Sequence, residues 1–191
     1  DAEHQLSDRE LAHCSRAVIA VETSVKRSKK TGMPAGELVY LGEPKPQKVR
    51  LTIFNYGKSK VEERHVDTVK ECIPFREKPG VTWLNVDGVH DTKLLQELAD
   101  CYNIEPLTLE DIATTDQRPK IEVHDAYVFV VMRVIRLTAG SERIGSEQVS
   151  LIVGSKMLIS FQETIGDVFD ALRERIRKNI GPIRRSGPDF L

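Results

Sequence analysis

Two adjacent carboxylates in the middle of the chain are the side chains best suited to hold a metal ion. They are Glu110 and Asp111, in the segment Ile104-Glu-Pro-Leu-Thr-Leu-Glu-Asp-Ile112. Pro106 suits the first position of a helix and Glu105 the cap before it, so the segment predicts a helix of about two turns. Both acids would lie in its last turn, where the helix dipole disfavours each carboxylate by roughly 0.3 to 1 kcal/mol unless a cation lies nearby.

The pair can serve a metal ion only as part of a larger site. Neighbouring side chains on a helix diverge by about 100°, so the two acids cannot grip one ion as a flat fork. They can reach one ion, or two adjacent ions, if other segments supply further oxygens. Two solvated acids on a surface helix are the simpler interpretation of the same residues.

Other candidate chemistries have weaker support in the sequence. The glycines at both ends of 140–145 have the spacing of a phosphate-binding loop, but Ser146-Glu147 replaces the required Lys-Ser/Thr. A metal-dependent hydrolase would have to be built around Asp87, His90 and Asp91. A strand that ends at Asp87 and a helix capped by Asp91 explain that grouping without metal. Because no nucleophile or base arrangement is identifiable, we expect that the chain is not an enzyme.

Composition limits the class of protein. The 191 residues carry 28 Lys+Arg against 29 Asp+Glu and are 40% hydrophobic, which predicts a soluble globular domain with a substantial core. The near-neutral charge argues against a nucleic-acid partner. No apolar run approaches the ~18 residues that cross a bilayer. A basic stretch from Arg173 to Arg185 leaves open a soluble interaction module as an alternative function.

The elements that must position the acids alternate along the chain. Residues 1–31 predict a separate amphipathic or flexible arm, and 32–191 the compact domain. Strands are expected at 49–53, 81–86 and 126–137, with a hairpin of 147–153 and 157–162. Helices are expected after the caps Thr68, Asp91 and Asp167, the first ending before Pro74 and the last reaching Ile180. The fold class is α/β, a mixed parallel and antiparallel sheet covered by helices on both faces in a single domain.

Several stretches, in order along 32–191, resemble the cytoplasmic N-terminal domain of the CorA family of magnesium transporters. The stretches are Thr82-Trp-Leu-Asn-Val-Asp-Gly88 with His90-Asp91, Pro106-Leu-Thr-Leu-Glu-Asp-Ile112 with Gln117-Arg-Pro-Lys120, Tyr127-Val-Phe-Val130, Glu147-Gln-Val-Ser150, and Phe161-Gln-Glu163 with Gly166-Asp-Val-Phe-Asp170 and Arg173-Glu-Arg-Ile-Arg177. Each is weak alone, but five in family order are specific. Residues 1–31 match nothing in this pattern.

The resemblance implies a regulatory domain of a cell-membrane transporter, on its cytoplasmic side. It implies a homopentamer in the full-length protein, with the stalk helix, two transmembrane helices and a Gly-Met-Asn pore signature beyond Leu191. It also implies weakly bound regulatory Mg²⁺ at subunit interfaces. In this pattern Asp111 is an interfacial ligand, and Glu110 is a ligand of an adjacent site to which the main chain near Met33 contributes.

The ion that the whole protein would carry stays open at this stage. Mg²⁺ and Co²⁺ are what the resemblance implies, and a zinc carrier of the same superfamily is the close alternative. The transported ion is expected to depend on the pore, which the resemblance places outside these residues.

Overall fold

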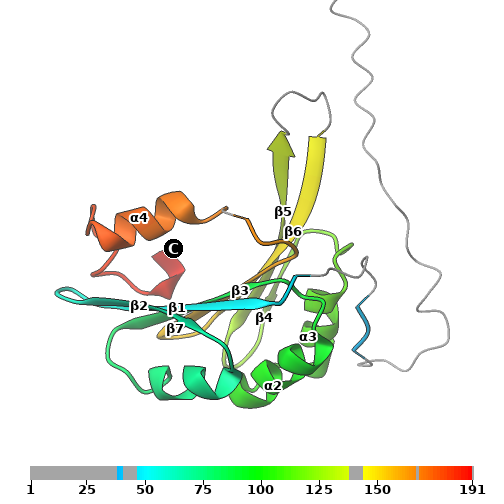
Figure 1. Cartoon of the computed structure of the whole chain (residues 1–191), viewed down its shortest axis with the longest axis horizontal. Coiled ribbons are helices and arrows are strands. Elements are labelled where there is room, and N and C mark those ends of the chain that lie inside the picture. Colours follow the sequence, from blue (N-terminus) through cyan, green and yellow to red (C-terminus); the bar gives the residue numbers. More distant parts are fainter. Residues whose placement is uncertain (1–37, 41–46, 138–143, 167, 191) are drawn as a thin grey trace, which may run out of the picture.

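The computed structural model describes residues 38–40, 47–137, 144–166 and 168–190. Within these ranges the chain forms a single sheet in the order β2-β1-β3-β7-β6-β5-β4 (Figure 1). Its strands are β1 (Arg50–Tyr56), β2 (Val61–Val66), β3 (Val81–Asp87), β4 (Lys120–Val123), β5 (Val128–Leu137), β6 (Ile144–Val153) and β7 (Met157–Gln162). The arm expected at 1–31 lies outside the described residues.

Helices cover the sheet from two sides (Figure 1). One face carries the 3₁₀ helix η2 (Val69–Phe75), α2 (Thr92–Tyr102) and α3 (Pro106–Ala113), and the other carries α4 (Asp170–Arg177) and the short η3 (Pro188–Phe190). Strands β3 and β7 pair in parallel, whereas the other neighbouring strands pair antiparallel. The expected mixed sheet with helices on both faces is therefore confirmed.

The larger core lies between the sheet and α2. Because side chains alternate along a strand, Leu84 and Val86 of β3 point to this face together with Ile159 of β7. Leu95 and Leu98 come from one stripe of α2, and both are fully buried. Asp91 caps α2 by accepting a hydrogen bond from the Leu94 amide at 3.1 Å, as expected.

A smaller core fills the space between the sheet and α4. Phe54, Trp83 and Leu158 from three adjacent strands pack there with Ile176 of α4. The α4 layer does not reach the β4 edge, where Ile121 and Val123 are 70% and 82% exposed. The two cores hold the sheet between α2 and α4, and the polar side chains at the ends of β3 and β7 lie outside both cores.

Three expectations about helices need correction. The helix expected to stop before Pro74 contains it, because a short 3₁₀ turn avoids the clash with the carbonyl four residues back that excludes proline from an α-helix. Helix α4 begins at Asp170 and ends at Arg177, where Asn179 takes a left-handed φ of 53°. Ile180, expected to face inward, is 50% exposed. Asp167 lies outside the described residues.

The packing of α2 predicts a contrast between two leucines. Leu98→Ala would leave a cavity at a fully buried position and should lower the free energy of unfolding by about 2 to 5 kcal/mol. Leu107→Ala removes the same atoms from an α3 side chain that is 58% exposed and should cost less than about 1 kcal/mol. Urea denaturation of both variants measures the difference. Equal losses would contradict the assignment of α2 as the helix that closes the core.

Candidate functional site

Helix α3 places the two candidate acids in its final turn. Glu105 occupies the N-cap, Pro106 the first turn, and Thr114 the C-cap, so the boundaries agree with the sequence. The Thr114 amide donates to the Glu110 carbonyl at 2.9 Å, which closes the helix. Glu110 and Asp111 are both partly exposed. Two candidate ligands therefore stand together at the negative end of a helix dipole, as the sequence predicted.

The Asp111 carboxylate is held by two side chains from beyond the helix. Gln117 Nε2 donates to Oδ1 at 2.7 Å, and Lys120 Nζ donates to Oδ2 at 2.5 Å. The Asp111 carbonyl also accepts a hydrogen bond from Gln148 Nε2 of β6, at 3.1 Å. Lys120 thus supplies the cation that an acid in the last turn of a helix requires.

Lys120 bridges two carboxylates. Besides Asp111, its ammonium donates to Glu122 Oε1 at 2.7 Å, on the same edge strand β4. Partial burial lowers the pKa of Lys120, but the hydrogen bonds to Asp111 and Glu122 outweigh that effect and raise the pKa above its ordinary value. The lysine therefore stays protonated at neutral pH. With side-chain exposures of 22% for Asp111 and 28% for Lys120, the pair remains open to ions from solution.

The sequence did not assign this role to Gln117 and Lys120. The family pattern includes both residues but assigns neither of them a role. The need of Asp111 for a cation is the signal that could have identified Lys120. Met33, the third candidate, lies outside the described residues. Among the residues that are described, no three His, Cys, Asp or Glu side chains form a group that could hold a metal ion by themselves.

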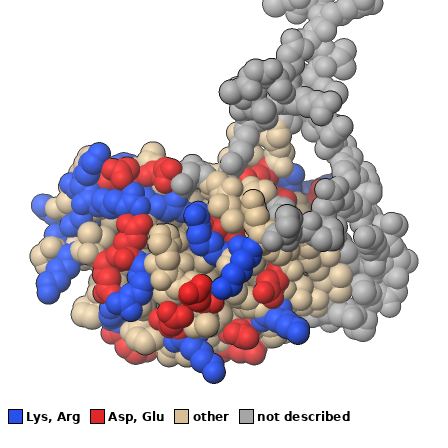
Figure 2. All heavy atoms as spheres, viewed as in Figure 1, with Lys and Arg blue, Asp and Glu red and all other residues tan. Residues whose placement is uncertain are grey.

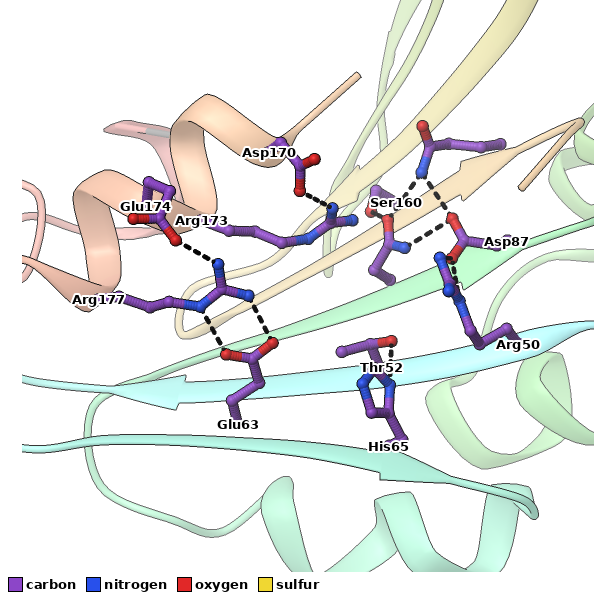
Figure 3. A network of polar contacts seen from close by, with 12 residues as sticks. Arg50, Thr52, Glu63, His65, Asp87, Ser160, Asp170, Arg173, Glu174 and Arg177 are labelled. Atoms are coloured by element: carbon purple, nitrogen blue, oxygen red, sulfur yellow. Dashed lines mark hydrogen bonds and ion pairs between the residues drawn. The ribbon is translucent and has the colours of Figure 1, made fainter. Parts of the chain in front are cut away.

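A second polar centre lies at the carboxyl ends of the parallel strands β3 and β7 (Figure 3). Asp87 is 1% exposed and accepts hydrogen bonds at 2.8 to 2.9 Å from Arg50 Nε, Asn85 Nδ2 and Gln162 Nε2. Ser160 donates to Asn85 Oδ1 at 2.7 Å and accepts from Trp83 Nε1 at 2.8 Å. Asp87 is thus occupied as the anchor of a buried network.

The neighbours of Asp87 do not join it in a catalytic group. His90 Nε2 lies 2.7 Å from the Gln47 carbonyl, and Asp91 caps α2. Gly88 follows the strand with a φ of 104°, a conformation that suits glycine. Each residue has a separate structural task, which favours the interpretation without metal over the hydrolase.

The basic stretch around α4 is largely engaged within the domain. Arg177 forms a two-point contact with Glu63 of β2 at 2.7 and 2.8 Å and also bonds to Glu174 (Figure 3). Hydrogen bonds from Arg177 hold the pKa of Glu63 below its ordinary value. Arg173 is buried over the rings of Phe54 and Trp83. These contacts do not favour an interaction module that uses α4 as a solvated basic face.

Comparison with known proteins finds one matching family. The model described as "CorA-like Mg²⁺ transporter protein" matches residues 78–187. This range contains the α3 acids, Lys120 and all of the Asp87 network except Arg50. The description is of a transporter family, which agrees with the expectation that the chain is not an enzyme.

One protein similar in sequence is described as a transport protein, and two similar structures are domains of CorA and ZntB proteins. The cobalt/magnesium transport protein CorA of Thermotoga maritima is 40% identical over 164 residues, which cover 86% of this chain and 46% of the relative. The soluble domain of CorA from Methanocaldococcus jannaschii has a TM-score of 0.50 at 11% identity and covers 70% of this chain and 50% of that one. The ZntB cytoplasmic domain from Vibrio parahaemolyticus has a TM-score of 0.53 at 12% identity and covers 71% of this chain and 52% of that one.

At these identities the two structures show a shared fold. The chain spans about half the length of these three proteins. Among the described residues, no helix is both long and apolar enough to cross a membrane.

The Asp87 network predicts a structural role for this acid. Asp87→Ala would leave Arg50, Asn85 and Gln162 without their shared acceptor and should lower the free energy of unfolding by about 2 to 4 kcal/mol. Asp67→Ala is the control, because the Asp67–Lys48 pair is 86% and 76% exposed and should contribute little. Chemical denaturation tests both. A stabilisation by Mg²⁺ that Asp87→Ala abolishes would contradict the structural role.

Proposed function

Because this chain belongs to the CorA family, we propose that it is the cytosolic regulatory domain of a divalent-cation transporter. The full protein would be a homopentamer in the cell membrane, with its pore in segments outside these residues. Its cargo would be Mg²⁺ or Co²⁺, as the name of the Thermotoga relative suggests. The likeness to a ZntB domain concerns the fold alone, so a zinc carrier stays the alternative. A flux assay with each ion on the full protein would separate them.

The observation that carries the regulatory proposal is the ion pair between Asp111 and Lys120. A partly exposed carboxylate at the end of α3 already holds one positive charge, the Lys120 ammonium at 2.5 Å. The negative charge that attracts an ammonium at this position would also attract a hydrated divalent cation. We propose that Asp111 and Glu110, with the main chain near Met33 contributing to the adjacent site, bind regulatory Mg²⁺.

The donor set fits Mg²⁺ only as half of a site. Mg²⁺ takes oxygen ligands, keeps several waters and is commonly bound through one or two carboxylates. Asp111 and Glu110 supply such oxygens, but the described residues hold no complete ligand group, so the remaining ligands would come from a neighbouring subunit. When bound, the ion would supply positive charge between carboxylates that otherwise repel one another across the interface.

Lys120 would act as a built-in competitor for the metal. Its ammonium now neutralises Asp111, so it must move before the carboxylate can bind a metal. Glu122, 2.7 Å from the same ammonium, offers it a second partner, which keeps the cost of that exchange low. Competition of this kind weakens binding and keeps it reversible, as a sensor of a changing concentration requires.

The homopentamer, a ring of five subunits, would convert weak binding at each interface into a shift between a closed and an open state. A ligand shifts an equilibrium only by its differential affinity for the two states, and several equivalent half-sites contribute together. High cytosolic Mg²⁺ would hold the closed, symmetric ring by bridging subunits at Asp111. Loss of the ion would leave facing acids and loosen the assembly.

The first test concerns Asp111. In the full-length transporter, Asp111→Asn removes the charge that holds the ion, so the internal Mg²⁺ concentration needed for half-inhibition should rise by about threefold to tenfold. Flux measured on reconstituted vesicles with varied internal Mg²⁺ reports it. Asp67→Asn, at an exposed carboxylate away from α3, is the matched control and should leave the dose dependence unchanged. An unchanged dose dependence in Asp111→Asn would sink the sensor proposal.

The second test concerns Lys120 and predicts the opposite change in the internal Mg²⁺ concentration needed for half-inhibition. Lys120→Gln removes the competing ammonium but keeps a hydrogen-bond donor for Asp111, so half-inhibition should require about threefold to tenfold less internal Mg²⁺. Lys178→Gln removes a charge from the exposed lysine at the C-cap of α4 and serves as the control. If Lys120→Gln weakens inhibition as Asp111→Asn does, the lysine supports the site and does not compete with the ion.

A further inference from the structure

A basic hollow lies at the end of the sheet opposite to the Asp87 network. It has a volume of about 790 Å³ and is lined by residues from four separate segments, 55–62, 78–81, 155–156 and 184–187. These segments are the β1–β2 turn with its flanking residues, the turn before β3, the β6–β7 turn and the chain after α4. Small-molecule sites commonly have volumes of about 300 to 1,000 Å³, so the hollow is of a suitable size.

The lining of the hollow is strongly positive. The lining includes one carboxylate, Glu62, and six cationic side chains. The cationic residues are Lys58, Lys60, Lys78, Lys156, Arg184 and Arg185. Lys78 pairs with Glu62 at 2.6 Å. Among the described residues no carboxylate pairs with Lys58, Lys60 or Lys156. Figure 2 shows Lys and Arg gathered at the end of the molecule where Figure 1 places the β1–β2 turn and the end of α4.

Arg184 is fixed in place without being neutralised. Its Nε donates to the Ile176 carbonyl and its Nη2 to the Arg177 carbonyl, each at 2.6 Å. These carbonyls belong to the last turn of α4, so the guanidinium is attracted to the negative end of that helix. A guanidinium oriented by backbone carbonyls keeps its full charge and is pre-organised for a planar contact with an oxyanion.

Tyr56 brings a buried polar group without a hydrogen-bond partner to the lining of the hollow. It lines the hollow with 1% of its surface exposed, and its hydroxyl is buried with no hydrogen-bond partner. A buried polar group of this kind normally has a partner, because leaving it unbonded is costly. Burial raises the pKa of Tyr56, so the hydroxyl stays a neutral donor. An anion that reached this hydroxyl would give it the acceptor that the described residues do not supply.

The rest of the lining leaves room for a ligand and offers it donors. Gly57, Gly80 and Gly187 carry no side chain into the hollow, and Ser59 and Ser155 bring hydroxyl groups. Gly80 has a φ of 94°, and a Cβ there would lie 2.3 Å from the Tyr56 carbonyl, so the backbone turn is restricted to glycine. The Gly80 turn therefore lies directly against the Tyr56 backbone.

We propose that this hollow binds a soluble, multiply charged phosphate compound such as an oligophosphate chain. Several unpaired lysines, a pre-organised arginine and hydroxyl donors converge there, and linked phosphate groups match that set in charge and in acceptors. A flat anionic membrane surface would meet the exposed lysines but could not enter a hollow of about 790 Å³. The observations therefore favour a small solute over a lipid bilayer.

Calorimetric titration of the 191-residue chain with inorganic tripolyphosphate tests the proposal. Binding should be measurable at about 0.1 M salt, where charges more than about 10 Å apart are largely screened. The double variant Lys60→Glu with Lys156→Glu should weaken it by at least about tenfold. The same charge change at exposed lysines outside the hollow, Lys70→Glu with Lys93→Glu, is the control and should have a much smaller effect.

A second variant distinguishes a ligand contact from a structural effect. Tyr56→Phe removes only the unbonded hydroxyl, so it should leave the thermal midpoint unchanged or higher while weakening tripolyphosphate binding by about threefold to tenfold. Absence of binding to the unmodified chain would overturn the proposal. Equal losses in the two double-lysine variants would also overturn it, and so would capture by phosphatidylglycerol vesicles without tripolyphosphate binding.

Discussion

Buried polar side chains between the two central strands must bond to one another, and the sheet is arranged around that requirement. Asn85 and Ser160 are fully buried, and their bond at 2.7 Å links β3 to β7. Asp87 extends the chain of contacts to Arg50 on β1. A slip of one residue would turn these groups toward the apolar core under α2 and leave each unsatisfied at about 1 to 3 kcal/mol. The network therefore specifies the register of the strands on which both faces of the domain are built.

The sequence predicts the centre of this sheet better than its edges. Val81–Val86 and Met157–Gln162 are mostly apolar because helices cover both faces of these strands, and both were expected where they occur. The edge strands β2 and β4 were missed. Glu62, Glu63 and Arg64 give β2 a charged run, and β4 has only four residues. Edge strands carry such features because they must avoid pairing with other chains, which removes the pattern that identifies a strand.

The candidate site was also predictable only in part, namely where it depends on residues close together in the sequence. Pro106 and the acid pair predict a helix and its last turn, which depend on neighbouring residues alone. The cation beside Asp111 comes from an unpredicted edge strand, nine positions further along the chain. The basic hollow collects residues from segments spread between positions 55 and 187. Charges that meet only through tertiary folding leave no local periodicity, so the structure was needed to bring them together.

The parallel pairing of β3 with β7 also has a kinetic consequence. Asn85 and Ser160 are 75 positions apart, whereas β1 pairs antiparallel with β2 and β3 through residues at most 37 positions apart. During synthesis the three early strands can assemble first, but one edge of β3 stays unpaired until β7 leaves the ribosome. Contacts at such separation slow folding, because the entropy of closing a long loop is lost before the contacts form. We therefore expect the nascent chain to depend on chaperones over that interval, and folding to finish only when its last strand arrives.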